Sequence, residues 1–467
     1  MKVLFIFFVT SLIIDQSLAQ GKFQISNIVI SGNKITKKEI IKRELTFNKG
    51  DRFSLKEINK QTKQSKENLI NLKLFNFVNI KTTTEEKNIN IIVELVERWY
   101  IWPYPILEVS ERNFNVWWNE FKESNYSDFS RMNYGVYLVW ENFFGKNQLL
   151  QIKYRKGFKE HYLLNYEIPY FNKEKTIGIN FFAQQFRRKK TFYKTDDNQL
   201  IYFENHADYT TKDYEFQIDL LYRKDIRHRH KLEFHYLQSN IADSIKYLSE
   251  GDYLGNNKLR GDYYKLKYQY TNEQRDYNEY PLSGHYLNLE LTKYFKRTSP
   301  VNYFQITGKI EQHIEINNRI FIGSSFKAKL STGEVYPYFA QEGLGFNDYV
   351  RTYEYYVING QRYWLSKTAI KYALVKKNHF NVPFVRKSQF KKSHFSIYLS
   401  IFSDLGYVID RQNTENSPLA NNLLFGKGIS LDYVTYYDKI LRIEFGINRL
   451  NEKGIFLHFT NPFGTNK

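Results

Sequence analysis

Apolar and polar residues alternate with a period of two in one segment after another beyond residue 99. Leu, Ile, Phe or Tyr takes every second position, and charged or amide side chains stand between them. Because successive side chains of a strand point to opposite faces, this pattern predicts many β-strands, each with one apolar and one polar face. The clearest examples are residues 150–155, 231–236, 264–270, 287–292 and 441–445.

Residues 21–98 show a different pattern, in which two helical segments lie between strands. The order β-α-α-β-β indicates one small α+β domain with a three-stranded sheet. The open edges of such a sheet can pair with an extended segment of another chain. The predicted elements are a strand at 23–30, helices that begin at the capping boxes Thr36/Glu39 and Ser54/Glu57, and strands at 75–80 and 90–97.

The first residues resemble an export signal. Lys2 is followed by a mostly apolar run at residues 3–14, and small residues at Ser17 and Ala19 suit a signal peptidase. A membrane anchor is the alternative, but the run is short of the ~20 residues that a spanning helix needs. We therefore predict a signal peptide at residues 1–19, and the lack of any cysteine excludes a lipid-anchored lipoprotein.

Composition narrows the class of protein. The chain has no cysteine, which excludes disulfides, thiol catalysis and thiolate metal sites. Aromatic residues make up 18% of it, with 39 Tyr and 38 Phe, which suits strands that face lipid on one side and water on the other. The net charge of +19 is also typical of nucleic-acid binders. The export signal leads away from nucleic acid, and anionic lipid head groups can attract the same charge.

Together these features predict a mainly β protein with a transmembrane antiparallel barrel at residues 99–467. A soluble sandwich would alternate too. The number of segments, their aromatic faces and the export signal favour a barrel, since lipid requires a sheet without open edges. The length predicts roughly 14 to 18 strands, with about 16 expected. Trp and Tyr at residues 99–105 suit a membrane interface, and Pro103 and Pro105 are expected to stop strand pairing at this boundary.

The N-terminal domain resembles a POTRA domain. Its element order carries the resemblance, together with the turn at Gly32 and Asn33, the strand entry at residues 74–78 and the closing residues 93–95. One copy is visible. The resemblance implies a periplasmic domain in front of an outer-membrane barrel.

The barrel resembles the BamA/TamA-type outer-membrane barrel-assembly superfamily. The turn at residues 276–284 is similar to one that recurs in the family. Residues 350–354 resemble an Arg-Gly-aromatic tip on a loop that folds back inside the barrel, and Glu354 is the last residue of this segment. Arg351 and Tyr353 match this tip. Thr352 stands where the family usually has glycine, a departure that concerns the tight backbone there.

The resemblance also implies a partner for Arg351. Phe402, Asp404 and Gly406 occupy alternate positions, hence one face of a strand. We expect a bidentate pair between Arg351 and Asp404, because an unpaired charge inside a narrow lumen is costly. The alternative is a solvated Arg351 and a strand-end Asp404. The family sometimes has a second acid on the strand between; Lys371 lies near that place, so none is predicted.

The C-terminus looks like the sorting strand of a barrel. The last strand is expected near residues 455–459, with Phe456, Phe459 and Phe463 as its aromatic signal. Four residues follow Phe463, which is a small departure from the family.

No enzyme site emerges. The cluster of His228 and His230 with Glu233 and His235 divides between two faces of a strand, which splits a metal site. There is no phosphate loop, serine elbow or zinc-helix motif. We predict no catalytic residue, cofactor or metal.

The leading functional hypothesis is an outer-membrane protein that assembles, inserts or translocates other proteins. The POTRA-like domain would receive extended outer-membrane or secreted clients by strand addition, and the barrel would pass them between its first and last strands. Lipid and periplasmic or lipoprotein accessory subunits are further expected partners. A dedicated two-partner secretion channel and a purely structural surface-antigen barrel are the alternatives.

Overall fold

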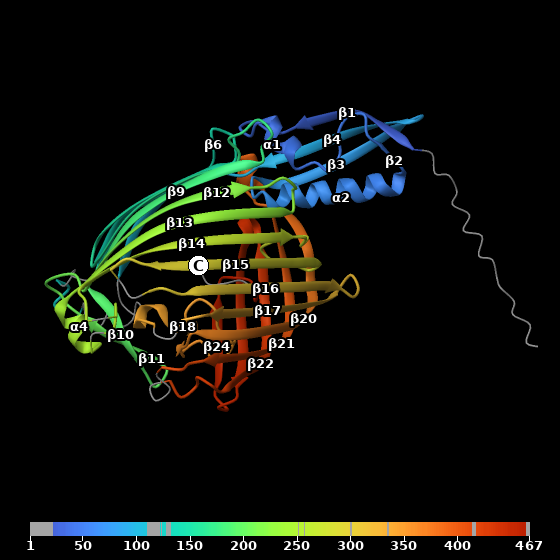
Figure 1. Ribbon diagram of the computed structural model, residues 1–467. Helices are drawn as coiled ribbons and strands as arrows, with labels where there is room; N and C mark the ends of the chain where they lie inside the picture. Colours follow the sequence, from blue (N-terminus) through green and yellow to red (C-terminus); the bar gives the residue numbers. More distant parts are fainter. Residues whose placement is uncertain are drawn as a thin grey trace, which may run out of the picture.

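The computed structural model describes residues 22–109, 122, 124–127, 132–250, 252–255, 257–298, 301–333, 336–412 and 417–463. The predicted signal peptide lies outside them. The chain forms a small N-terminal domain against one end of a curved sheet (Figure 1). Within the described residues, no helix has the length and apolar character needed to cross a membrane.

The N-terminal domain has the predicted order with one addition, a two-residue strand between the helices. The sheet order is β2-β1-β4-β3, in which β1 pairs with β4 in parallel and β3 pairs with β4 in antiparallel. The sheet therefore has four strands and not the expected three. Its elements are β1 (Phe23–Ser31), α1 (Lys38–Arg43), β2 (Arg52–Phe53), α2 (Leu55–Asn71), β3 (Phe75–Glu85) and β4 (Asn88–Glu97).

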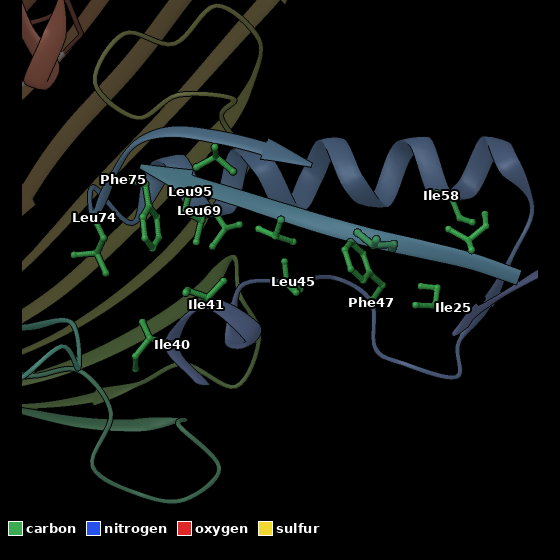
Figure 2. Close-up of a cluster of buried hydrophobic side chains, with 14 of the residues drawn as sticks. Ile25, Ile40, Ile41, Leu45, Phe47, Ile58, Leu69, Leu74, Phe75 and Leu95 are labelled. Carbon is green, nitrogen blue, oxygen red and sulfur yellow. The ribbon is translucent and has the colours of Figure 1, made fainter. Parts of the chain in front are cut away.

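The core of this domain lies between the helices and the sheet (Figure 2). Ile41, Leu69 and Ile91 are fully buried. The capping box at Ser54 forms as predicted, with Glu57. The one predicted at Thr36 does not form, because α1 begins one residue later, with Lys37 as its N-cap and no side-chain cap. The Thr36 hydroxyl instead bonds the Tyr100 hydroxyl and the Asn142 amide.

The remaining chain forms one antiparallel sheet of 16 strands, which confirms the predicted barrel (Figure 1). Neighbours in the sheet follow chain order. Two hairpins are inserted in loops: β10 (Lys190–Asp196) with β11 (Gln199–Glu204), and β18 (Glu342–Leu344) with β19 (Ile358–Asn359). The strands are β5 (Ile101–Val109), β6 (Met132–Phe143), β7 (Gln148–Gly157), β8 (Lys159–Ile168), β9 (Ile177–Arg188), β12 (Thr211–Tyr222), β13 (His228–Ile241), β14 (Arg260–Glu273), β15 (Gly284–Lys296), β16 (Phe304–Glu315), β17 (Ile320–Ser331), β20 (Arg362–Asn381), β21 (Lys392–Ile409), β22 (Leu423–Thr435), β23 (Lys439–Asn448) and β24 (Lys453–His458).

The alternation read from the sequence separates an outer and an inner face. On β13, Leu232 and Phe234 are 42% and 48% exposed, whereas Glu233 and His235 are 3% and 4% exposed. On this strand the apolar side chains face outward and the charged ones face inward, as a barrel in lipid requires.

Pro103 and Pro105 do not end the strand pairing, contrary to the prediction. Both lie within β5, which pairs with β6 from Ile101 to Val109. Proline is tolerated because β5 is the first strand of the sheet, and an edge strand needs N–H donors on one side only.

The N-terminal domain contacts several barrel turns. Glu44 forms a bidentate pair with Arg223 at 2.6 and 2.7 Å. Arg98 pairs with Asp438 in the short helix η2 (Tyr436–Asp438), and Tyr277 also donates to this carboxylate. These contacts seat the domain on the end of the barrel that carries the β8–β9, β12–β13, β14–β15 and β22–β23 turns.

Candidate functional site: the lumen loop and the seam

The segment between β17 and β20 sends a loop into the barrel. Residues 345–357, here called the lumen loop, lie between the short strands β18 (Glu342–Leu344) and β19 (Ile358–Asn359), which pair with each other. Val350, Arg351 and Tyr353 at its tip are at most 2% exposed. A polar residue at such a depth requires partners on the barrel wall.

The structure brings Arg351 and Asp404 together. The guanidinium donates from Nε to Oδ2 at 2.8 Å and from Nη2 to Oδ1 at 2.5 Å, and the Arg351 backbone N–H donates to Oδ2 at 3.1 Å. Both side chains are fully buried. The guanidinium carbon lies 4.0 Å from the centroid of the Phe402 ring. Bidentate hydrogen bonds offset part of the desolvation of both charges.

Thr352 keeps the tight backbone that the family builds with glycine. Its φ is +80°, a conformation that β-branched residues rarely adopt. Two glycines of the wall make room for it: a Cβ on Gly426 would lie 2.0 Å from the Arg351 carbonyl oxygen, and one on Gly446 would lie 2.4 Å from the Thr352 methyl carbon. The loop tip thus packs against a part of the barrel wall that has no side chains, at Gly426 and Gly446.

The other predicted residues of this region also lie at the loop. A Cβ on Gly406 would lie 2.5 Å from a Val350 methyl carbon, so Gly406 permits the close approach of the tip. The Tyr353 hydroxyl accepts the Arg449 backbone N–H at 3.3 Å. Glu354 faces His458 at 3.3 Å.

A second acid near Arg351 was missed. It is Glu444 on β23, whose Oε1 lies 3.6 Å from Arg351 Nη1 and 2.8 Å from Arg442 Nε. Lys371, which lies near the place where the family sometimes has the second acid, donates to the Pro281 carbonyl oxygen at 3.2 Å. The alternation of residues 441–445 already placed Arg442 and Glu444 on one polar face, but it could not show that this face meets Arg351.

The first and last strands form the seam of the barrel. Over the described residues, β5 pairs only with β6 and β24 pairs only with β23. Ile455 and Leu457 on the outer face of β24 are 72% and 56% exposed. The seam is therefore the place where the backbone ladder of the sheet is interrupted.

The three C-terminal aromatics lie in different places. Phe456 is buried within β24, whereas Phe459 follows the strand and is 72% exposed. Phe463 turns back into the barrel, where it is 2% exposed and packs on His313. The Phe463 N–H donates to Asn461 Oδ1 at 2.8 Å, which fixes this turn.

The cluster of His228, His230, Glu233 and His235 is divided between two faces of β13, as predicted. His228 and His230 contact the hydroxyls of Tyr270 and Tyr268, whereas His235 contacts Glu233 on the inner face.

In the N-terminal domain, Gly32 has a φ of +87° and a Cβ on it would lie 1.9 Å from the Leu95 carbonyl oxygen, so only glycine suits this turn. Asn33 Nδ2 donates to the Thr36 carbonyl oxygen at 3.0 Å, which closes the turn before α1.

Most of the barrel sequence matches one known family. A model of the Omp85 superfamily domain matches residues 142–435, which is more than half of the chain. The chain belongs to the Omp85 superfamily. A POTRA model described as a surface antigen variable number repeat matches residues 23–98 of this Omp85 protein. Proteins of this superfamily are outer-membrane barrels with periplasmic POTRA domains that insert or secrete other proteins.

One solved structure has a similar fold. CdiB from Escherichia coli is 11% identical, with a TM-score of 0.51 over 93% of this chain and 75% of that chain. BamA from Haemophilus ducreyi lacking POTRA domains 1–3 is 15% identical, with a TM-score of 0.47 over 94% of this chain and 83% of that chain. No curated protein matches the sequence. At 11% identity, the similarity to CdiB concerns the fold alone.

Proposed function

We propose that this Omp85 protein takes up extended protein clients by strand addition at its POTRA domain and passes them into the membrane through the seam. The observation that carries the proposal is the interrupted ladder between β5 and β24. An unpaired strand edge offers backbone groups to an incoming strand with little demand on its side chains.

The sequence of β5 weakens any closed seam. Proline within a sheet is confined to edges where its missing N–H is not needed. Since β6 occupies one side of β5, Pro103 and Pro105 are best tolerated with their nitrogens toward the seam. Two donors are then missing from the nine residues of β5, and β24 offers only six residues. A client strand would therefore compete with at most a short pairing between β5 and β24.

The strand order of the POTRA domain limits where a client can add. The strand at residues 91–96 belongs to β4, which lies between β1 and β3 and has no free edge. Among the described residues, the free edges are those of β3 and of β1 beyond Ile25, whose backbone N–H and C=O still bond Asp51 and Gly50. The start of β3 already touches the barrel, since Asn76 donates to the Gln389 carbonyl at 2.9 Å. The exposed far end of β3 is therefore the best docking edge.

Site-specific photo-crosslinking in cells tests this proposal. Probes at Thr82 and Thr84 on β3, and at Leu457 on β24, are expected to capture several unfolded outer-membrane proteins. A probe at Ile92 on the central strand β4, and one at Phe234 in the middle of the sheet, serve as matched controls that should capture none. Capture of a single secreted protein would favour the dedicated secretion channel. Capture of nothing at β3 and β24 would contradict client handling and favour a structural barrel.

A further inference from the structure

Three side chains converge where the lumen loop meets the last two strands. Glu354 comes from the loop, Glu444 from β23 and His458 from β24. His458 Nε2 lies 3.3 Å from Glu354 Oε1 and 3.2 Å from Glu444 Oε2. One ligand-type atom of each residue lies within 4.8 Å of the other two. The cluster therefore joins three separate segments at one point.

The side chain of Glu444 is buried, and those of Glu354 and His458 are partly buried. Both carboxylate oxygens of Glu354 and of Glu444, and Nε2 of His458, have no hydrogen bond of good geometry among the described residues, although Glu444 Oε1 forms an ion pair with Arg442 Nε at 2.8 Å. The side chain of Glu444 is only 1% exposed. His458 Nε2 is close to both oxygens, yet it is not aligned for a hydrogen bond to either. Buried polar groups without partners are rare, and a bound ion is one explanation.

The surroundings orient the three groups toward one another. The Tyr349 hydroxyl lies 3.2 Å from His458 Nδ1, which leaves Nε2 to face the carboxylates. The guanidinium groups of Arg442 and Arg351 both face Oε1 of Glu444, whereas Oε2 faces His458. A second contact that fixes the far side of a ligand is typical of metal sites.

We propose that Glu354, Glu444 and His458 bind a divalent transition-metal cation of the zinc type, with water in the fourth position. Zn–N and Zn–O bonds of about 2.0–2.2 Å in a tetrahedron separate neighbouring ligand atoms by about 3.3–3.6 Å. The 3.2 and 3.3 Å separations at His458 match this spacing closely. One imidazole with two carboxylates is a ligand set that zinc accepts.

The proposed ion would tie the lumen loop to the strand at the seam. His458 is the last residue of β24, and Glu354 follows the buried tip that Arg351 anchors. An ion that binds only the folded arrangement stabilises it in proportion to its occupancy. This site is independent of how clients are handled, so its test does not depend on the proposed function.

A second cluster inside the barrel provides a contrast. Asp219, Glu233 and His235 also converge, but Lys231 Nζ lies 2.9 Å from Asp219 and 2.8 Å from Glu233. Both ring nitrogens of His235 contact carboxylates. An ammonium group already takes the place of a cation there, so this cluster is a matched control.

Metal binding by the full chain in detergent tests the proposal. After treatment with a chelator at neutral pH, the protein is titrated with ZnCl2 by calorimetry, and its thermal midpoint is measured with and without zinc. One Zn²⁺ per chain and a raised midpoint are expected. Glu354→Gln and His458→Gln should each weaken binding by more than the about 10–100-fold that loss of an outer partner costs. His235→Gln should bind zinc like the parent chain.

Cobalt adds a readout that does not depend on stability. Co²⁺ in place of zinc should give the visible absorption of a tetrahedral site, and this absorption should disappear in Glu354→Gln. Heat-modifiability on a gel shows whether each variant is folded. The proposal is overturned if the parent chain binds no stoichiometric Zn²⁺, or if folded Glu354→Gln and His458→Gln bind it as tightly as His235→Gln does. These outcomes are expected if His458 is protonated and simply forms ion pairs with Glu354 and Glu444.

Discussion

The interiors of the two domains differ in the charged side chains that they bury. Inside the POTRA domain, Ile41, Leu69 and Ile91 are fully buried. Inside the barrel the fully buried side chains include the charged Arg351 and Asp404 beside apolar ones such as Val350, while the exposed outer face is mostly apolar. Both regions contain strands with alternating apolar and polar residues. The pattern alone therefore indicates only that a strand has two different faces. Whether water or lipid lies on each side of the sheet decides which face is the interior.

The largest effect is expected where the barrel interior loses one charge of a pair. Arg351→Ala leaves Asp404 buried without its partner, which costs about 3–5 kcal/mol. Heat-modifiability and abundance in the outer membrane should both fall. Arg155→Ala is the control, because its pair with Glu108 at 2.9 Å is partly exposed and such pairs contribute about 1 kcal/mol or less. Equal behaviour of the two variants would contradict the account.

A truncation in the POTRA core should have nearly as large an effect. Leu69→Ala removes packing at a fully buried position, for which about 2–5 kcal/mol is typical. The free energy of unfolding of the domain, followed by limited proteolysis, should fall accordingly. Leu232→Ala on the lipid side of the barrel is the matched variant. It should have a much smaller effect, because lipid fills the space that the side chain leaves.

A charge on the outer face should destabilise the barrel where the same charge inside does not. Ile310, in the middle of β16, is 53% exposed on the lipid side. Ile310→Lys is expected to cost about 2–4 kcal/mol in refolding into lipid vesicles. Gln305→Lys places the charge on the inner face of the same strand. If both variants refold equally well, the assignment of the two faces is wrong.

The junction between the domains should respond to acid. Burial raises the pKa of the Asp438 carboxyl, but the hydrogen bonds and charge of Arg98 outweigh it and hold the pKa below its usual value. The pair therefore stabilises domain docking above the unfolded pKa of about 3.9, and this contribution is lost as the pH falls through the folded pKa. Protease protection of residues 97–100 should show the loss, and Asp438→Asn should remove the pH dependence below about pH 4.

Much of the fold could be predicted because it depends on short-range patterns. Alternation at residues 231–236 placed Leu232 outside and Glu233 inside, and the capping box at Ser54 marked the start of α2. The prolines of β5 were misread, since their local effect on pairing depends on a position at the edge of the sheet. Thr36 was misread for a similar reason, as its hydroxyl bonds Asn142 across the domain junction.

The candidate site was less accessible to the sequence. Arg351 and Asp404 were paired only through the family resemblance, because 53 residues separate them. Glu44 and Arg223 are 179 residues apart and carry no local signal. His458 was read as part of a terminal strand. Its meeting with Glu354 and Glu444 depends on how deeply the lumen loop enters the barrel, which no spacing along the chain reports.

The central claim is that clients pass through the seam between β5 and β24. The chain has no cysteine, so cysteines can be introduced in pairs along Ile101–Val109 and Lys453–His458, and a pair that oxidises to a disulfide locks the seam. A control lock joins Ile218 and Phe234, which are already register partners on β12 and β13. The measurement is insertion of an outer-membrane client into vesicles that contain the purified protein. The account predicts that the seam lock stops insertion, that reductant restores it, and that the control lock has no effect. Full insertion through a locked seam would contradict it.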